Sequence, residues 1–193
     1  MTDADFEKMS AFSCGVDALD SFFQKEVREC VNRHYLAAYC AYLTSGEIVA
    51  AFTLMNDALM IAEQTEKEDF IDDLRFETDA DIVDFFNRQT SYPAINIGHL
   101  GTSSSYQSKG IGTAIIDLVA DTFTGYRQAG CQFVTVDALN NHRCTKFYQT
   151  NGFSYQTNKD SCSLTRRWYR LLKYERKNLI LAYKKNAPTL LFE

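Results

Sequence analysis

The sequence lacks any long apolar run: no stretch of its 193 residues approaches the roughly 18 consecutive apolar residues that a membrane span requires. Its first 30 residues carry acids and no continuous apolar segment, which argues against a targeting leader. Internal repeats, low-complexity tracts and Pro/Gly-rich linkers are missing as well. We therefore expect a cytoplasmic protein without membrane contact, folded as one domain over residues 1–193.

Patterns for metal binding and disulfides are also scarce. The three histidines are far apart and form no HExxH spacing, so no metal site is expected. The six cysteines include no CxxC pair, and most of them sit among apolar neighbours. Free, largely buried thiols are therefore favoured over disulfides. These cysteines are Cys14, Cys30, Cys40, Cys131, Cys144 and Cys162.

Charge is present but unevenly distributed along the chain. Ten acids against two bases between Glu63 and Asp84 give this segment a local charge of −8, although the whole chain carries only −5. From Lys159 to Lys185, nine bases face two acids, a local charge of +7. Each segment is either the solvated face of a surface helix or part of a charged rim around a site.

Hydrophobic periodicity predicts alternating helices and strands. Helical spacing occurs over residues 16–31, in the acidic segment at about 62–92, after Gly110 and over 141–153. Strands are expected at 35–43, 47–55, 94–102, 131–139 and 178–185, with a tight turn at Ser45–Gly46 between the first two. This order predicts an α/β fold of the α+β kind, with an acidic helical insertion at about 62–92.

A glycine-rich turn precedes the helix that follows the strand at 94–102. The stretch YQSKGIGTAIIDLV places Gly110 and Gly112 at a helix start that has no side-chain cap. Free N–H groups there, supported by the helix dipole, form an anion site that glycines let a phosphate approach. A GxGxxG fingerprint is excluded by Ile115, and no P-loop GxxxxGK[ST] is present. Taken alone, a purely structural turn explains the glycines equally well.

Two motifs together give the turn a family context. Residues 107–112, QSKGIG, resemble the Q/R-x-x-G-x-G/A pyrophosphate loop of the GNAT superfamily, the acetyl-CoA-dependent N-acetyltransferases. Residues 141–153 are similar to the family's N-x-x-A-x-x-F/L-Y-x-x-x-G-F helix, with Cys144 in place of the usual small residue. Residues 12–20 also resemble the F-x-C-G-x-x-x-L opening of acetyltransferase toxins of bacterial toxin-antitoxin pairs.

The resemblance implies a mixed, mostly antiparallel sheet whose fourth and fifth strands splay apart around acetyl-CoA. The backbone of Leu100, Gly101 and Thr102 would pair with the pantetheine arm, and Asn141 would help to seat it. A helix N-cap is the alternative role for Asn141. Lys109 would add charge at the phosphates, or is simply solvated. The pyrophosphate would be held by backbone amides of Gln107, Ser108, Lys109, Gly110, Ile111, Gly112 and Thr113.

By the same resemblance, Tyr148 is the catalytic acid that protonates the departing thiolate of CoA. A phenol with an ordinary pKa of ~10 is protonated at neutral pH and can hydrogen-bond to sulfur. The alternative is a packing aromatic beside Phe147. The general base is left open. The position of the family's strand glutamate holds Asn96, which cannot be a base. His99 is the nearby titratable candidate, but in a regular strand it points to the opposite face from Asn96 unless a β-bulge reverses the parity, so it is interpreted as a structural histidine. An acceptor that is already partly neutral, such as an α-amino group, would need no base.

Three functions remain after this argument. The acidic segment and a pI near 5.3 disfavour RNA, so a small-molecule or peptide amine is the preferred acceptor. The basic segment keeps aminoacyl-tRNA, the acceptor of the resembling toxins, as an alternative. A non-catalytic acyl-CoA sensor is the third function. A homodimer and an antitoxin partner are left open.

Overall fold

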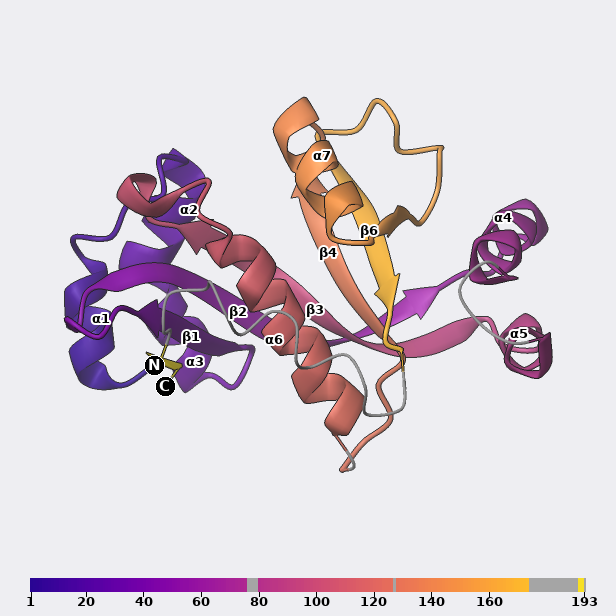
Figure 1. Cartoon of the computed structure of the whole chain (residues 1–193), viewed down its shortest axis with the longest axis horizontal. Helices are drawn as coiled ribbons and strands as arrows, with labels where there is room; N and C mark the ends of the chain where they lie inside the picture. Colours follow the sequence, from indigo (N-terminus) through magenta and orange to yellow (C-terminus); the bar gives the residue numbers. More distant parts are fainter. Residues whose placement is uncertain (76–79, 127, 174–190, 193) are drawn as a thin grey trace. The chain divides into compact units, whose positions relative to one another are not determined.

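The computed structural model describes residues 1–75, 80–126, 128–173 and 191–192, and its strands form one mixed sheet (Figure 1). The strand order is β5-β6-β4-β3-β2-β1-β7. β1 pairs antiparallel with β2 and β7, and β6 pairs antiparallel with β4 and β5, whereas β3 and β4 are parallel. The strands are β1 (Ala37–Tyr42), β2 (Ile48–Met60), β3 (Ser91–Thr102), β4 (Phe133–Leu139), β5 (Ser154–Tyr155), β6 (Thr165–Leu171) and β7 (Leu191–Phe192). The predicted fold class is confirmed.

Helices occupy the connections between these strands. They are α1 (Asp3–Met9), α2 (Asp17–Ser21), the π-helix η1 (Phe22–Glu26), α3 (Val27–Asn32), α4 (Gln64–Arg75), α5 (Ala80–Asn87), the 3₁₀ turn η2 (Ser104–Tyr106), α6 (Ile111–Gly125) and α7 (His142–Thr150). The helix predicted over residues 16–31 is therefore a succession of α2, η1 and α3. The short helix α1 has no counterpart among the predicted elements.

The chain divides into two compact units. The first contains Met1–Met55, Ile97–Asp121 and Lys173–Glu193, and the second contains Asn56–Asn96 and Thr122–Leu172. Three elements, β2, β3 and α6, cross from one unit to the other. The single domain expected over residues 1–193 stays a prediction.

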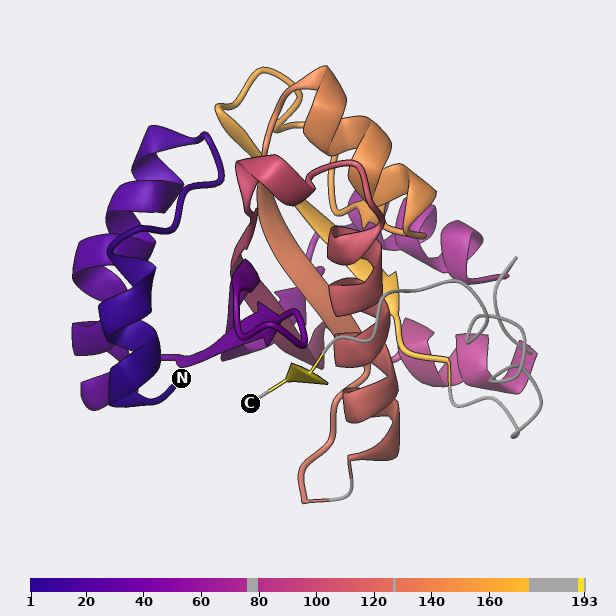
Figure 2. The same cartoon turned by 60° about the vertical axis from the view of Figure 1, so that its left-hand side comes forward.

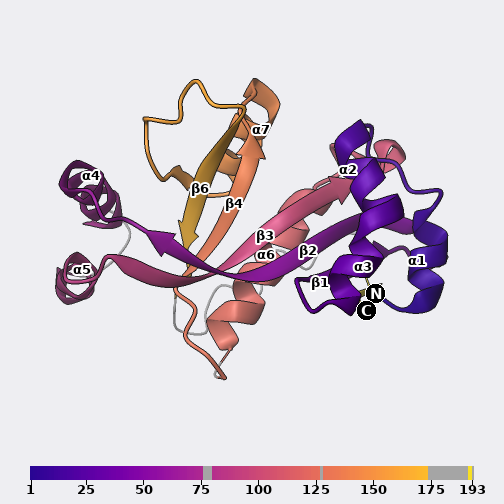
Figure 3. The same ribbon diagram turned by 180° about the vertical axis from the view of Figure 1, so that it is seen from behind.

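Unit 1 packs α1–α3 against β1 and the first part of β2. Met9, Phe23 and Val27 from the helices are fully buried and belong to the same hydrophobic cluster as Ala38 and Cys40 of β1. The three helices lie beside these strands in the views from both sides (Figures 1 and 3). The tight turn predicted between β1 and β2 is present. Gly46 lies in it with a φ of 83°, a conformation that glycine adopts without strain.

Unit 2 buries an aromatic core between β3, β4, β6 and the two acidic helices. Phe70 of α4 contacts the rings of Phe86, Tyr92, Phe133 and Tyr169. α4 and α5 lie side by side between the ends of β2 and β3 (Figure 3). The predicted helices of the acidic segment are thus present, with one apolar face in the core. α7 lies against the β4–β6 pair (Figure 2).

The basic segment is not a surface helix where the structure describes it. Its residues 165–171 form the buried strand β6, in which Trp168 is only 1% exposed. Its buried positions are the apolar Trp168, Tyr169 and Leu171 together with Arg166, whereas Arg167 and Arg170 are half-buried. The strand candidate at 178–185 lies outside the described residues.

Pairing between β3 and β4 is short. The register covers only Ala94–Asn96 against Phe133–Thr135, although β3 continues to Thr102 and β4 to Leu139. On its other side, β4 pairs with β6 over its full length, from Phe133 to Leu139. A parallel pair that stops after its first residues is what the expected splaying of these two strands requires.

Candidate active site

The glycine-rich turn has the backbone of an anion-binding loop. After the 3₁₀ turn η2, Ser108 adopts a φ of 60° and Gly110 a φ of 79°, both in the left-handed region. No described protein atom lies within 4 Å of the position that a Cβ would take at Gly110. Gly110 is therefore required by its backbone conformation, and the space above it is open. Left-handed residues of this kind turn successive N–H groups into a concave anion-binding nest.

The start of α6 supplies further donors. Its first backbone hydrogen bond runs from the N–H of Ala114 to the carbonyl of Gly110, at 3.0 Å. The amides of Ile111, Gly112 and Thr113 precede this bond and have no acceptor among the described residues. Three unpaired N–H groups at the positive end of a 15-residue helix suit a pyrophosphate. The donor set therefore fits CoA, and the assignment of these residues to it stays a prediction.

Two side chains of the turn are engaged with the protein itself. The Gln107 amide donates to the carbonyls of Cys14 and Thr102, at 2.7 and 3.2 Å. Lys109 Nζ lies 4.6 Å from the ring centroid of Tyr106, whose hydroxyl donates to Glu47 at 2.9 Å. Gln107 thus shapes the loop with its side chain, and Lys109 stays close to it through a cation–π contact.

The predicted pantetheine strand is the end of β3. Leu100, Gly101 and Thr102 are its last residues. A Cβ at Gly101 would lie 3.3 Å from both Cys14 Cβ and Phe23 Cε2, so the glycine permits the close approach of the N-terminal segment. Backbone pairing of these residues with a ligand stays a prediction.

In unit 2, α7 carries the other two predicted site residues. Asn141 is the N-cap of the helix, and its Oδ1 accepts the N–H of Cys144 at 2.9 Å. Its alternative role as a cap is therefore present, and a contact with pantetheine stays a prediction. The ring of Tyr148 packs against Phe153 and Trp168, and no acceptor or donor for its hydroxyl is found within the described ranges.

The environment of Tyr148 keeps its phenol protonated. Burial raises its pKa well above the ordinary value, and the nearby Cys144 thiol adds to the shift. A neutral phenol with an uncommitted hydroxyl is the form that a general acid needs. The packed ring and the unbonded hydroxyl of Tyr148 are thus compatible with both the packing role and the catalytic role.

The base position is occupied by a hydrogen-bonded amide. Asn96 Nδ2 donates to Thr135 Oγ1 at 3.1 Å, and Thr135 in turn donates to the carboxylate of Asp57. The same Asp57 oxygen forms an ion pair with Arg167, which also pairs with Asp137 at 2.7 Å. Asp57 was not found by sequence reasoning, because its partners lie on β4 and β6, far along the chain. Its charge is committed to Arg167.

His99 has the environment expected of a structural histidine. Its ring stacks on Phe22 of η1 with a centroid distance of 3.5 Å, and its Nδ1 lies 3.0 Å from Thr53 Oγ1. Burial lowers the pKa of His99 to about 4, so the imidazole is neutral at physiological pH but a weak base.

The acidic helix α4 lines an open hollow of unit 2. This open cavity of about 440 Å³ has Asp69, Asp72 and Asp73 on one wall and Tyr155 and Trp168 among its aromatic residues. Asp72 pairs with Arg75 at 2.6 Å, and Asp73 accepts the Tyr169 hydroxyl at 3.0 Å. Asp69 has no such partner among the described residues. The charge of this wall is therefore only partly compensated.

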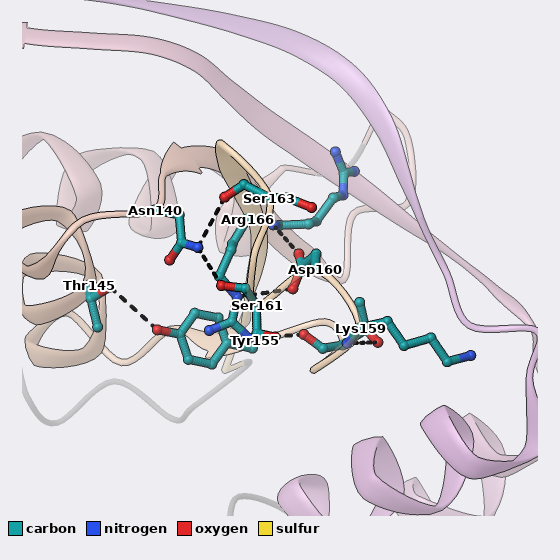
Figure 4. Close-up of polar contacts among 10 residues, drawn as sticks. Asn140, Thr145, Tyr155, Lys159, Asp160, Ser161, Ser163 and Arg166 are labelled. Atoms are coloured by element: carbon teal, nitrogen blue, oxygen red, sulfur yellow. Dashed lines mark hydrogen bonds and ion pairs between the residues drawn. The ribbon is translucent and has the colours of Figure 1, made fainter.

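Several bases of the basic segment are neutralised within unit 2. Arg166 of β6 pairs with Asp160 of the preceding loop at 2.9 Å, a contact visible beside Lys159 and Tyr155 in Figure 4. Lys159 forms an ion pair with Glu63 from the acidic segment. The two oppositely charged segments of the sequence thus partly compensate each other.

Neither a metal site nor a membrane span is seen in the part of the chain that the structure describes. None of the described His, Cys, Asp and Glu residues gather in a group of three that could hold a metal ion. No described helix is long and apolar enough to cross a membrane. The six cysteines are free thiols, of which Cys14, Cys40 and Cys131 are buried.

Comparison with known proteins agrees with this arrangement. Residues 53–155 match the model of the acetyltransferase (GNAT) domain family. The chain therefore belongs to the GNAT family, and it is an acyltransferase of the GNAT type. No curated protein sequence matches it.

Solved structures with a similar fold include bacterial toxins. A tyrosine-to-phenylalanine mutant of KacT is 18% identical, with a TM-score of 0.65, and the match covers 89% of this chain and 91% of that one. AtaT complexed with acetyl-methionyl-tRNAfMet is 16% identical, with a TM-score of 0.61 and coverages of 84% and 86%. AtaTR bound with acetyl-CoA is 19% identical, with a TM-score of 0.57 and 88% of both chains covered. These similarities concern the fold.

Proposed function

We propose that the protein transfers the acetyl group of acetyl-CoA to the α-amino group of an aminoacyl-tRNA. The observation that carries this proposal is the lack of a strong base among the described candidates. Asn96 is an amide, His99 has a pKa of about 4, and Asp57 is held by Arg167. An enzyme with this equipment requires an amine that is already partly neutral at physiological pH. The α-amino group, with a reference pKa of ~8, meets this condition far better than a lysine side chain at ~10.4.

The ester bond to tRNA strengthens this argument. An α-ester withdraws electrons and lowers the pKa of the neighbouring ammonium, so a larger share of the amine is a free nucleophile at neutral pH. The structural neighbours support the same acceptor, since one of them is complexed with acetyl-methionyl-tRNAfMet. This reverses the preference drawn from composition, in which tRNA was the second acceptor. The cytoplasmic location expected from the sequence follows from the same proposal, because aminoacyl-tRNA is found there.

In this reaction acetyl-CoA supplies the acetyl thioester. The amine nitrogen forms a bond to the acetyl carbon, the carbon–sulfur bond breaks, and one amine proton goes to solvent. The loop amides from Ser108 to Thr113 bind the pyrophosphate. Tyr148 donates its phenolic proton to the departing sulfur and recovers one from solvent afterwards. The products are the N-acetylated aminoacyl-tRNA and CoA with a free thiol.

A cationic small-molecule or peptide amine remains a second candidate. The observation that favours it is the partly uncompensated acidic wall formed by Asp69, Asp72 and Asp73. A negative field of this kind attracts amines and repels phosphates.

Transfer of radiolabelled acetyl groups tests the proposal. Purified protein is incubated with labelled acetyl-CoA and, separately, with aminoacyl-tRNAs, uncharged tRNA, N-terminal peptides and polyamines. Label is expected on aminoacyl-tRNA alone, in a form released when the aminoacyl ester is hydrolysed. Label on polyamines or peptides would establish the second candidate. CoA binding without transfer to any acceptor would establish an acyl-CoA sensor. Counting label avoids thiol reagents, which would also react with the exposed Cys162.

A further inference from the structure

The carboxylate of Asp20 organises a turn near the N-terminus. Its Oδ2 accepts the Ser13 hydroxyl at 2.6 Å, and its Oδ1 accepts the N–H of Cys14 at 2.7 Å. The N–H of Gly15 donates to Ser13 Oγ at 3.2 Å, with Gly15 at a φ of 77°. Burial raises the pKa of Asp20, but these hydrogen bonds outweigh burial and leave the pKa below its ordinary value. The ionised carboxylate therefore stabilises the turn Phe12–Gly15.

The carbonyl groups of this turn bind the start of the phosphate loop. The Ser13 carbonyl accepts the N–H of Ser104 at 3.0 Å and its hydroxyl at 3.3 Å. The Cys14 carbonyl accepts the Gln107 side chain at 2.7 Å. Ser104 and Gln107, which precede Ser108, are thus both bonded to the same turn.

Burial makes the turn a firm support. Phe12 and Cys14 are each 5% exposed, and the Phe12 carbonyl accepts the Gln24 side chain at 2.8 Å. Gly101 of β3 lies close to Cys14, because a Cβ added at Gly101 would be only 3.3 Å from Cys14 Cβ. The turn is therefore held between the helices of unit 1 and the strand that leads into the loop.

We propose that the turn Phe12–Gly15 braces the phosphate loop, and that Asp20 is a positioning residue for the pyrophosphate of acetyl-CoA. The inference rests on the proposed acetyl-CoA site. Asp20 acts through the turn: it fixes the two carbonyls that hold Ser104 and Gln107, and these in turn keep the amides after Gln107 pointing outward. Ordering these amides before binding lowers the entropy that the ligand must overcome.

Removal of Asp20 separates this role from simple electrostatics. Deleting a negative charge near a phosphate site should tighten the binding of CoA, whereas loosening the brace should weaken it. We expect Asp20→Ala to weaken CoA binding about tenfold in calorimetry, which is ~1.4 kcal/mol. Asp17→Ala is the matched control, since Asp17 lies on the same helix, α2, and has no side-chain partner within the described residues. Its CoA affinity should equal or exceed that of the wild type.

A truncated substrate shows where the defect acts. S-acetylpantetheine lacks the pyrophosphate, so kcat/KM for it should be the same in wild type and Asp20→Ala, while kcat/KM for acetyl-CoA falls. An equal fall for both substrates would mean general damage and would overturn the brace. If Asp20→Ala does not fold, Asp20→Asn and Ser13→Ala, each of which removes fewer bonds, replace it under the same expectations.

Failure of the brace differs from failure of the proposed function. If the wild type does not bind CoA, the acetyl-CoA site itself is wrong. If the wild type binds CoA and the Asp20 variants bind it equally well, the site stands and the brace is rejected.

Discussion

Tyr148 can be tested as a general acid because its catalytic role needs the phenolic oxygen, whereas its packing role needs only the ring. Tyr148→Phe keeps the ring contacts with Phe153 and Trp168 and removes the only proton that the side chain can donate. Turnover should fall by roughly 10²-fold or more, with CoA affinity close to that of the wild type. Single-turnover kinetics and calorimetry measure the two quantities.

Tyr155→Phe is the matched control for this substitution. Tyr155 also packs on Trp168, and its hydroxyl makes only a long contact of 3.4 Å with Thr145. Its loss should leave turnover nearly unchanged. If Tyr148→Phe kept full activity, the buried phenol would be a packing residue and another group would have to protonate the thiolate.

His99 predicts a pH dependence of stability. Its folded pKa of about 4 lies below the ordinary 6.5 of an unfolded chain, so the unfolded state takes up a proton first as the pH falls. The contribution of the buried neutral His99 to the free energy of unfolding is complete above pH ~6.5 and is lost as the pH falls from there toward 4. Between pH 7 and 4.5 the wild type should lose more free energy of unfolding than His99→Gln. Equal losses in urea titrations would show that the ring is solvated in the folded protein.

Among the elements, the start of α6 predicts that replacing Gly112 by alanine has two opposite effects: the helix is stabilised, and CoA binding is weakened. Gly112 lies in the first turn of α6, where alanine favours the helix by about 1 kcal/mol. A Cβ there would also block the close approach of a phosphate. Gly112→Ala should therefore keep or raise Tm while it weakens CoA binding, and adding Gly110→Ala should bring the loss to at least tenfold, ~1.4 kcal/mol. Unchanged affinity in a folded double variant would reduce the loop to a structural turn.

The acidic helix α4 distinguishes the two acceptors. Replacement of Asp69, Asp72 and Asp73 by Asn should lower kcat/KM for cationic amines and raise the affinity for tRNA. Both effects should shrink with added salt, because the screening length at 0.15 M is only ~8 Å. Glu68→Gln is the control on the same helix, since Glu68 is exposed and does not line the cavity. A flat result for both acceptors would place the acidic wall away from the acceptor site.

Elements with strong local signals could be predicted from the sequence. Helix α7 follows its N-cap Asn141 and ends before Gly152, and β1 and β2 flank a glycine turn, so neighbouring residues specify each of them. β6 was missed because its arginines suggested an exposed face. Two of them, Arg166 and Arg167, are compensated by Asp160 and Asp57, and Asp57 lies far away in the sequence.

The residues of the candidate site also fall into those that the sequence could predict and those that it could not. The loop glycines, Tyr148 and Asn141 could be found because each belongs to a contiguous motif. The roles of Asp20 and Asp57 and the contacts of His99 depend on segments that are distant in the sequence. No local sequence pattern could therefore predict them.

At the scale of the whole molecule, the interleaved chain predicts cooperative unfolding. β2, β3 and α6 each contribute residues to both compact units, so neither unit can unfold without breaking an element of the other. Trp168, the only tryptophan, lies in unit 2, whereas far-UV circular dichroism reports on both units. The two signals should give coincident denaturation curves. Separate midpoints would contradict the single domain expected from the sequence.

The strand β7 has a consequence for synthesis on the ribosome. Its residues Leu191 and Phe192 cover Ala41 and Tyr42 of β1, an edge that is translated long before them. Both segments of unit 2, residues 56–96 and 122–172, have been translated by then. This edge of β1 therefore stays open until Leu191 and Phe192 have been made, after both segments of unit 2.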